Sequence, residues 1–167
     1  VMDDVTVSNN SAERSPALYL RGPSTVTNCR INNNISNNAS AGTSAINVDN
    51  CTANVTGCTI SGNSGATIIY VSNNTNSILN LTNCVVEDNT AIYEQHGVVD
   101  IQASGTLNVT DLKLANNTSA FSVIEVKGKL TANGLEVTGN TGIAGINLTS
   151  TANFSVQGKL LITNNKT

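Results

Sequence analysis

The side chains that could bind a ligand are few, and five of them gather in one part of the repeat pattern. Tyr70, Asp100 and Glu125 occupy the same outward position in successive repeats, and Tyr93 and His96 lie in the segment that precedes Asp100. Carboxylates beside an aromatic ring can bind a sugar or a cation. These five residues are therefore the candidate ligand-binding residues. The alternative is a solvated sheet face with no ligand, because outward strand positions are polar in any case. The full column is Tyr19, Asn47, Tyr70, Asp100, Glu125 and Asn147.

The same residues argue against catalysis. No Arg or Lys stands in that column to act as a base or to clamp an acidic substrate. His96 is the single histidine, and no nucleophile elbow accompanies it, so we expect it in an exposed loop. Asp3 and Asp4 are strand neighbours that face opposite ways and cannot flank one bond. We predict no catalytic residue and no enzymatic activity.

The cysteines indicate packing rather than metal chemistry. Cys29, Cys58 and Cys84 fall in one inward column, and no paired C-x-x-C spacing occurs. We predict no metal site and no cofactor, and we expect a ladder of free buried thiols that act as small hydrophobic side chains. A disulfide between two of them is the alternative. Cys51 lies out of the column, either free or paired with Cys29 or Cys58.

A four-residue unit, aliphatic-x-x-Asn, recurs along the whole chain at intervals of 23 to 29 residues. Each copy is preceded by an alternating strand and followed by a variable loop and another alternating strand. The pattern predicts an all-β fold, a right-handed parallel β-helix (a solenoid) of about seven coils of three short strands, over a single domain of residues 1–167. The Asn column should sit at a bend, bond backbone groups, tolerate left-handed geometry and stack as a ladder. Its members are Asn10, Asn34, Asn63, Asn89, Asn117, Asn140 and Asn165.

Composition limits the partners. The net charge is -3 and charged residues make up 11% of the chain, so nucleic acid is not an expected partner. No apolar run is long enough to cross a membrane, and we expect no membrane insertion in this segment. Thirteen Asn-x-Ser/Thr sequons accompany 27 Asn residues, which composition in a bacterial protein explains, although glycosylation in a eukaryotic one stays open.

The Asn unit resembles the Phe-x-x-Asn repeat of polymorphic outer-membrane-protein-like, autotransporter-adhesin-like β-helices, with Ile, Leu or Val in place of Phe. Their second motif, Gly-Gly-Ala-aliphatic, survives loosely as Ser15-Pro16-Ala17-Leu18, Thr43-Ser44-Ala45-Ile46 and Ala144-Gly145-Ile146, among others. The resemblance implies a surface-exposed, adhesive protein.

Both ends of the chain lie within the repeat, so we expect a fragment of a longer surface protein. The predicted function is a non-catalytic scaffold or stalk of a cell-surface or secreted, extracellular adhesin-like protein, with loops that contact a host-surface protein or glycan. The alternatives are a polysaccharide-active β-helix enzyme (lyase, hydrolase or epimerase) and a glycan-binding module. Uncapped coils would also permit end-to-end self-association.

Overall fold

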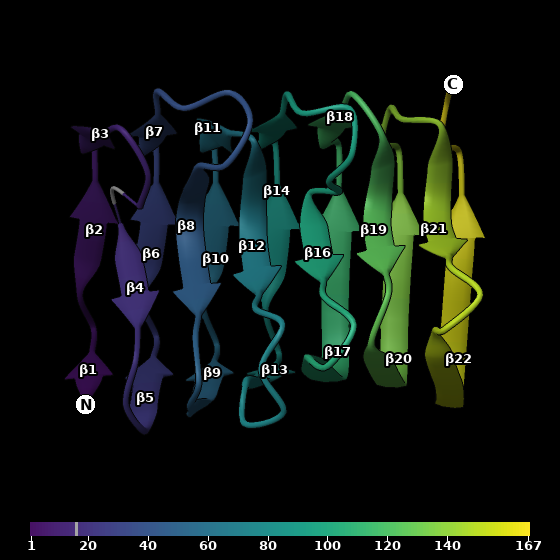
Figure 1. The fold of residues 1–167 in the computed structure, drawn as a ribbon, viewed down its shortest axis with the longest axis horizontal. Coiled ribbons are helices and arrows are strands. Elements are labelled where there is room, and N and C mark those ends of the chain that lie inside the picture. Colours follow the sequence, from purple (N-terminus) through teal and green to yellow (C-terminus); the bar gives the residue numbers. More distant parts are fainter. Residues whose placement is uncertain (16) are drawn as a thin grey trace.

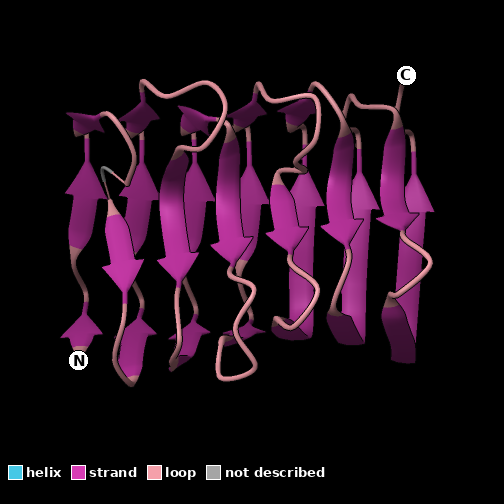
Figure 2. Ribbon diagram, in the orientation of Figure 1, coloured by secondary structure: helices cyan, strands magenta, loops and turns pink. Residues whose placement is uncertain are grey.

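The chain forms a parallel β-solenoid of about six turns, seen side-on in Figure 1, with its two termini at opposite ends of the rod. The structure is a computed structural model that describes residues 1–15 and 17–167. Its described elements are all strands, and Figure 2 shows them in three rows joined by loops. These features confirm the predicted all-β parallel solenoid and agree with a right-handed β-helix. Seven Asn units enclose six intervals, which is why seven predicted coils correspond to about six turns. Pro16, in the first copy of the second motif, lies outside the described residues.

The first sheet has eleven strands and is built from two strand columns. In the early coils each column has its own short strands. From Thr106 onward one long strand per coil spans both columns. The early strands are β1 (Met2–Asp3), β2 (Thr6–Ser8), β5 (Ser24–Thr27), β6 (Arg30–Asn32), β9 (Thr52–Thr56), β10 (Thr59–Ser61), β13 (Ile78–Thr82) and β14 (Val85–Glu87), and the long ones are β17 (Thr106–Ala115), β20 (Lys129–Thr138) and β22 (Asn153–Thr163).

The other two sheets complete each coil. The second sheet consists of two-residue strands directly after the Asn units, which the alternation pattern did not reveal because two residues cannot alternate visibly. They are β3 (Ser11–Ala12), β7 (Ile35–Ser36), β11 (Ser64–Gly65), β15 (Thr90–Ala91) and β18 (Thr118–Ser119). The third sheet carries the candidate column on β4 (Leu18–Leu20), β8 (Thr43–Val48), β12 (Thr67–Val71), β16 (Val99–Ile101), β19 (Ser122–Val126) and β21 (Ala144–Leu148).

The core between the sheets is a set of stacked aliphatic columns. Ile60 pairs in register with Ile31 on one side and Val86 on the other, and all three side chains are fully buried. The cysteine column behaves as predicted. Cys29, Cys58 and Cys84 are each 1% exposed and free, and Cys51 is also buried and free, so the disulfide alternative is wrong. Hydrogen bonding to the Cys84 thiol, together with burial, raises the pKa of Cys58.

The predicted Asn ladder is present and continuous over all six steps. In each step the backbone N–H and the Nδ2 group of one Asn donate to Oδ1 of the Asn one coil further on, at 2.8 to 3.1 Å. Nδ2 also donates to the carbonyl of the aliphatic residue of the preceding unit, as from Asn63 to Ile31 at 2.9 Å. The five inner Asn side chains are buried. Parallel stacking satisfies amides that would otherwise be costly to bury.

Left-handed backbone geometry falls one residue earlier than predicted. The ladder Asn residues themselves have no positive φ, whereas the residue before each of them does, with φ between 55° and 66°. The bend is therefore made by a preceding Asn, Asp or Gly, residue types that tolerate this conformation. These residues are Asn9, Asn33, Gly62, Asp88, Asn116, Gly139 and Asn164. A second such column precedes the cysteine column, at Asp4, Asn28, Gly57, Asn83, Asp111, Gly134 and Gly158.

Candidate functional site

The candidate column exists in the predicted register on the third sheet. Tyr70 on β12 pairs with Asp100 on β16, and Asp100 pairs with Glu125 on β19. Asn47 on β8 lies on the other side of Tyr70. Consecutive coils thus place an amide, a phenol and two carboxylates in one line along the rod.

The expectation of a solvated face is wrong for the two carboxylates. Asp100 has no exposed surface and Glu125 is 2% exposed, although both side chains leave the sheet on its outer side. The loop of residues 92–98 between β15 and β16 returns across this face of the sheet, and its backbone comes close to the backbone of Ser122 and Glu125 at Gly97. The same loop brings His96 against Asp100. A loop that returns across the sheet therefore covers positions that alternation alone would leave in water.

Asp100 is the centre of a polar network. His96 Nδ1 contacts Asp100 Oδ2, the Gln102 amide donates to Oδ1 at 2.8 Å, and Lys127 Nζ lies 3.6 Å from Oδ2. Two sequence expectations need correction here. His96 is half-buried rather than exposed, and a lysine does reach the column. Lys127 was missed because it lies two residues beyond Glu125 on the same strand end, diagonal to Asp100 rather than in line with it.

The charges in this network are distributed unequally. Burial and the neighbouring Lys127 ammonium lower the pKa of His96 to about 4, so the imidazole is neutral near pH 7. A neutral ring that donates from Nδ1 to the carboxylate keeps Nε2 as an acceptor. Burial also lowers the pKa of Lys127, while Glu125 and Tyr93 oppose that change. Burial therefore keeps the histidine uncharged, and the Lys127 ammonium, 3.6 Å from Asp100 Oδ2, adds to this effect.

Glu125 is occupied within the chain. Its Oε2 accepts hydrogen bonds from Ser122 Oγ at 3.0 Å and from Asn147 Nδ2 at 2.8 Å. Tyr19, at the other end of the column, is also engaged, because its hydroxyl donates to Asp49 and Arg21 lies 5.7 Å from its ring centre. The Glu125 Oε2 atom and the Tyr19 hydroxyl are thus both engaged within the chain.

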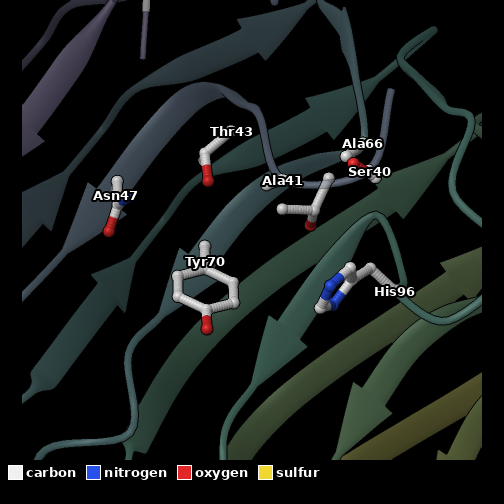
Figure 3. A pocket seen from close by; sticks show the side chains of 8 residues that line it. Ser40, Ala41, Thr43, Asn47, Ala66, Tyr70 and His96 are labelled. Carbon is white, nitrogen blue, oxygen red and sulfur yellow. The ribbon is translucent and has the colours of Figure 1, made fainter. Parts of the chain in front are cut away.

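A small cavity of about 160 Å³ opens beside the network, and Figure 3 shows its wall. Tyr70 and His96 line it with their rings nearly perpendicular, at 81° and 6.0 Å between centres. The Tyr93 ring also packs against the His96 ring, with the two ring centres 5.0 Å apart. Of the five predicted residues, two line the cavity, Tyr93 supports it, and Asp100 and Glu125 lie outside it. The other lining residues are Ser40, Ala41, Thr43, Asn47, Ala66 and Thr67.

Asn47 is the cavity residue that sequence reasoning undervalued. It stands in the candidate column, but its type gave no reason to choose it among 27 Asn residues. Its Oδ1 is buried and has no hydrogen-bond partner among the described residues. Buried polar atoms are nearly always paired, so an unpaired one beside a cavity suggests a group that a ligand would engage.

Comparison with known protein families, with known proteins and with solved structures finds no match for this chain. Among residues 1–15 and 17–167, no group of three or more His, Cys, Asp or Glu side chains is placed to hold a metal ion. The described part of the chain also has no helix that is long and apolar enough to cross a membrane. Function must therefore be argued from the solenoid and from the Tyr70–His96 cavity themselves.

Proposed function

We propose that residues 1–167 act as a rigid, non-catalytic segment of a cell-surface or secreted adhesin-like protein. The solenoid serves as a scaffold or stalk, and its loops contact a host-surface protein or glycan. The observation that supports this role is the uninterrupted Asn ladder, in which every step repeats the same two hydrogen bonds from the first coil to the last. A rod whose recurrent Asn residues bond each coil to the next is suited to holding its loops at fixed positions.

The resemblance of the Asn unit to polymorphic outer-membrane-protein repeats supports the same proposal. It concerns ladder residues, whose role in the solenoid is the one described above, and adds the expectation of an extracellular, adhesive protein. The loops offer the contact surface, because binding residues are commonly carried on loops held by a rigid scaffold.

The rigidity can be tested with two spin labels in one outward column of the first sheet. Thr25 and Ser155 belong to the same column and are separated by five inter-coil steps. At ~4.8 Å per step the labelled Cα atoms should be about 24 Å apart. A narrow distance distribution in pulsed electron paramagnetic resonance supports a rigid stalk, and a broad one refutes it. The contact role is tested by binding of the labelled protein to a glycan array and to cultured cells, and it fails if neither binds.

One observation favours a second candidate, a polysaccharide-active enzyme. The His96–Asp100 contact resembles the arrangement in which a carboxylate orients an imidazole that acts as a general base. Among the described residues no serine, threonine or cysteine forms a hydrogen bond with His96, so this base would have to activate water. The test is turnover of neutral or acidic polysaccharides. Activity that is lost in His96→Gln and also in Asp100→Asn would establish the enzyme and overturn the non-catalytic proposal.

A further inference from the structure

We infer that the cavity between β8, β12 and the loop before β16 binds a single uncharged pyranose ring, either as a free sugar or as the terminal residue of a glycan. This inference names the ligand class for the contact role in the proposed function and rests on that role for its biological setting. The ligand-binding residues are then Asn47, Tyr70 and His96, which line the cavity, rather than the carboxylates of Asp100 and Glu125.

The aromatic wall matches one face of a sugar. The Tyr70 ring is half-buried on the cavity wall, and the His96 ring meets it edge to face (Figure 3). Tyr93 packs against His96 and restricts the movement of that ring. A pyranose has an apolar face of C–H groups that can pack on an aromatic surface, while its hydroxyl groups point to the sides. A rigid aromatic ring loses little conformational entropy when it makes such a contact.

Three polar side chains around the cavity are available to those hydroxyl groups. Asn47 Oδ1 is unpaired, and the amide presents an acceptor and a donor side by side. His96 Nε2 is an acceptor, because Nδ1 is committed to Asp100. Burial, together with the Asp49 carboxylate, raises the pKa of Tyr70, so its phenol stays protonated and can donate. Sugar hydroxyl groups both donate and accept, and they complement this mixed set.

Charge and size narrow the ligand class. The eight lining residues include no Lys or Arg, and the ammonium group of Lys127 is held at Asp100. An acidic sugar would therefore enter without a cationic partner among the lining residues. A cation is a poor candidate too, because Asp100 and Glu125 are covered and already hydrogen-bonded. The cavity, at about 160 Å³, lies below the roughly 300 Å³ at which pockets for drug-sized ligands begin. One ring fits that limit better than an oligosaccharide.

The test is nuclear magnetic resonance titration of the isotope-labelled chain. The probes are the methyl glycosides of glucose, galactose, mannose and N-acetylglucosamine, with methyl glucuronide as the acidic comparator. We expect at least one neutral glycoside to shift amide signals of residues 40–47, 66–70 and 96, and we expect methyl glucuronide to bind at least tenfold more weakly. A glycan array carrying the same sugar in terminal and internal positions then distinguishes a free sugar from a glycan end as the source.

Matched variants separate binding from folding. Tyr70→Ala and Asn47→Ala should each weaken binding at least tenfold, whereas Tyr19→Ala changes a tyrosine of the same column outside the cavity and should leave binding unchanged. The unchanged amide spectrum of the first sheet would show that each variant is folded. The inference is overturned if no neutral glycoside binds, if glucuronide binds best, or if Tyr70→Ala binds as wild type. The spin-label distance is independent of these results, so loss of the sugar site would leave the scaffold proposal standing.

Discussion

Replacement of Asn89 by alanine should be among the most destabilising single changes in this chain. The side chain of Asn89 takes part in five hydrogen bonds. It accepts from the N–H and Nδ2 groups of Asn63, and it donates to Ile60 O, Glu87 O and Asn117 Oδ1 at 2.8 to 2.9 Å. The residue is 1% exposed, so water cannot replace these partners.

The magnitude follows from what the substitution leaves behind. The buried N–H group of Asn63 loses its acceptor, which costs about 1–3 kcal/mol. The remaining partners keep other hydrogen bonds, as Glu87 O does with the N–H group of Gly62, so each of those losses is nearer 0.5–1 kcal/mol. We expect Asn89→Ala to lower the free energy of unfolding by about 3–7 kcal/mol.

Asn54 provides the matched control, because it lies outside the ladder. Its exposed side chain accepts one hydrogen bond, from Asn80 at 2.8 Å, and Asn54→Ala should cost under ~1 kcal/mol. Denaturant unfolding followed by far-ultraviolet circular dichroism measures both variants. If Asn89→Ala unfolds at the same denaturant concentration as Asn54→Ala, the ladder does not stabilise the solenoid and our reasoning about it is refuted.

Three further outcomes are expected. The four cysteines, none more than 5% exposed, should resist alkylation in the native protein and react fully in denaturant, and mass spectrometry that finds a native adduct would contradict their burial. Because folding lowers the pKa of His96 from 6.5 to about 4, the unfolded chain binds a proton more readily between these values. Stability should therefore fall by up to about 3 kcal/mol as the pH drops from 6.5 to 4, and His96→Gln should remove this part of the pH dependence in urea titrations. Asp100→Ala should lower the free energy of unfolding by about 3 kcal/mol, because Lys127 and His96 lose their shared partner. Adding Lys127→Met to this variant should recover part of the lost stability in thermal unfolding. No recovery would show that Lys127 and Asp100 do not interact.

The corrections at the candidate site have a common origin. Strand alternation states on which side of a sheet a residue lies, and it placed Asp100 and Glu125 correctly on the outer side. It does not state what covers that side. The loop of residues 92–98 brings His96 against Asp100, while Ser122 and Asn147 bond the Glu125 carboxylate. The path of that loop depends on packing against the sheet rather than on any local pattern. The same limit explains why Lys127 was missed, since a diagonal neighbour in the next coil is invisible to an argument made along one column.

The sequence by itself determined the solenoid. The seven Asn units, the inward aliphatic and cysteine columns and the outward column are periodic. Stacking identical positions buries the inward aliphatic side chains of the inner coils and lets each Asn bond to the next. The residue before each Asn carried a further signal, because Asn, Asp or Gly recurs wherever φ is positive. Only the tertiary structure decided the chemistry of the site. The contact of His96 with Asp100, the unpaired side-chain oxygen of Asn47 and the cavity beside Tyr70 come from loops of unequal length that fold back on a regular sheet. No repeat can encode a feature that occurs in one coil alone.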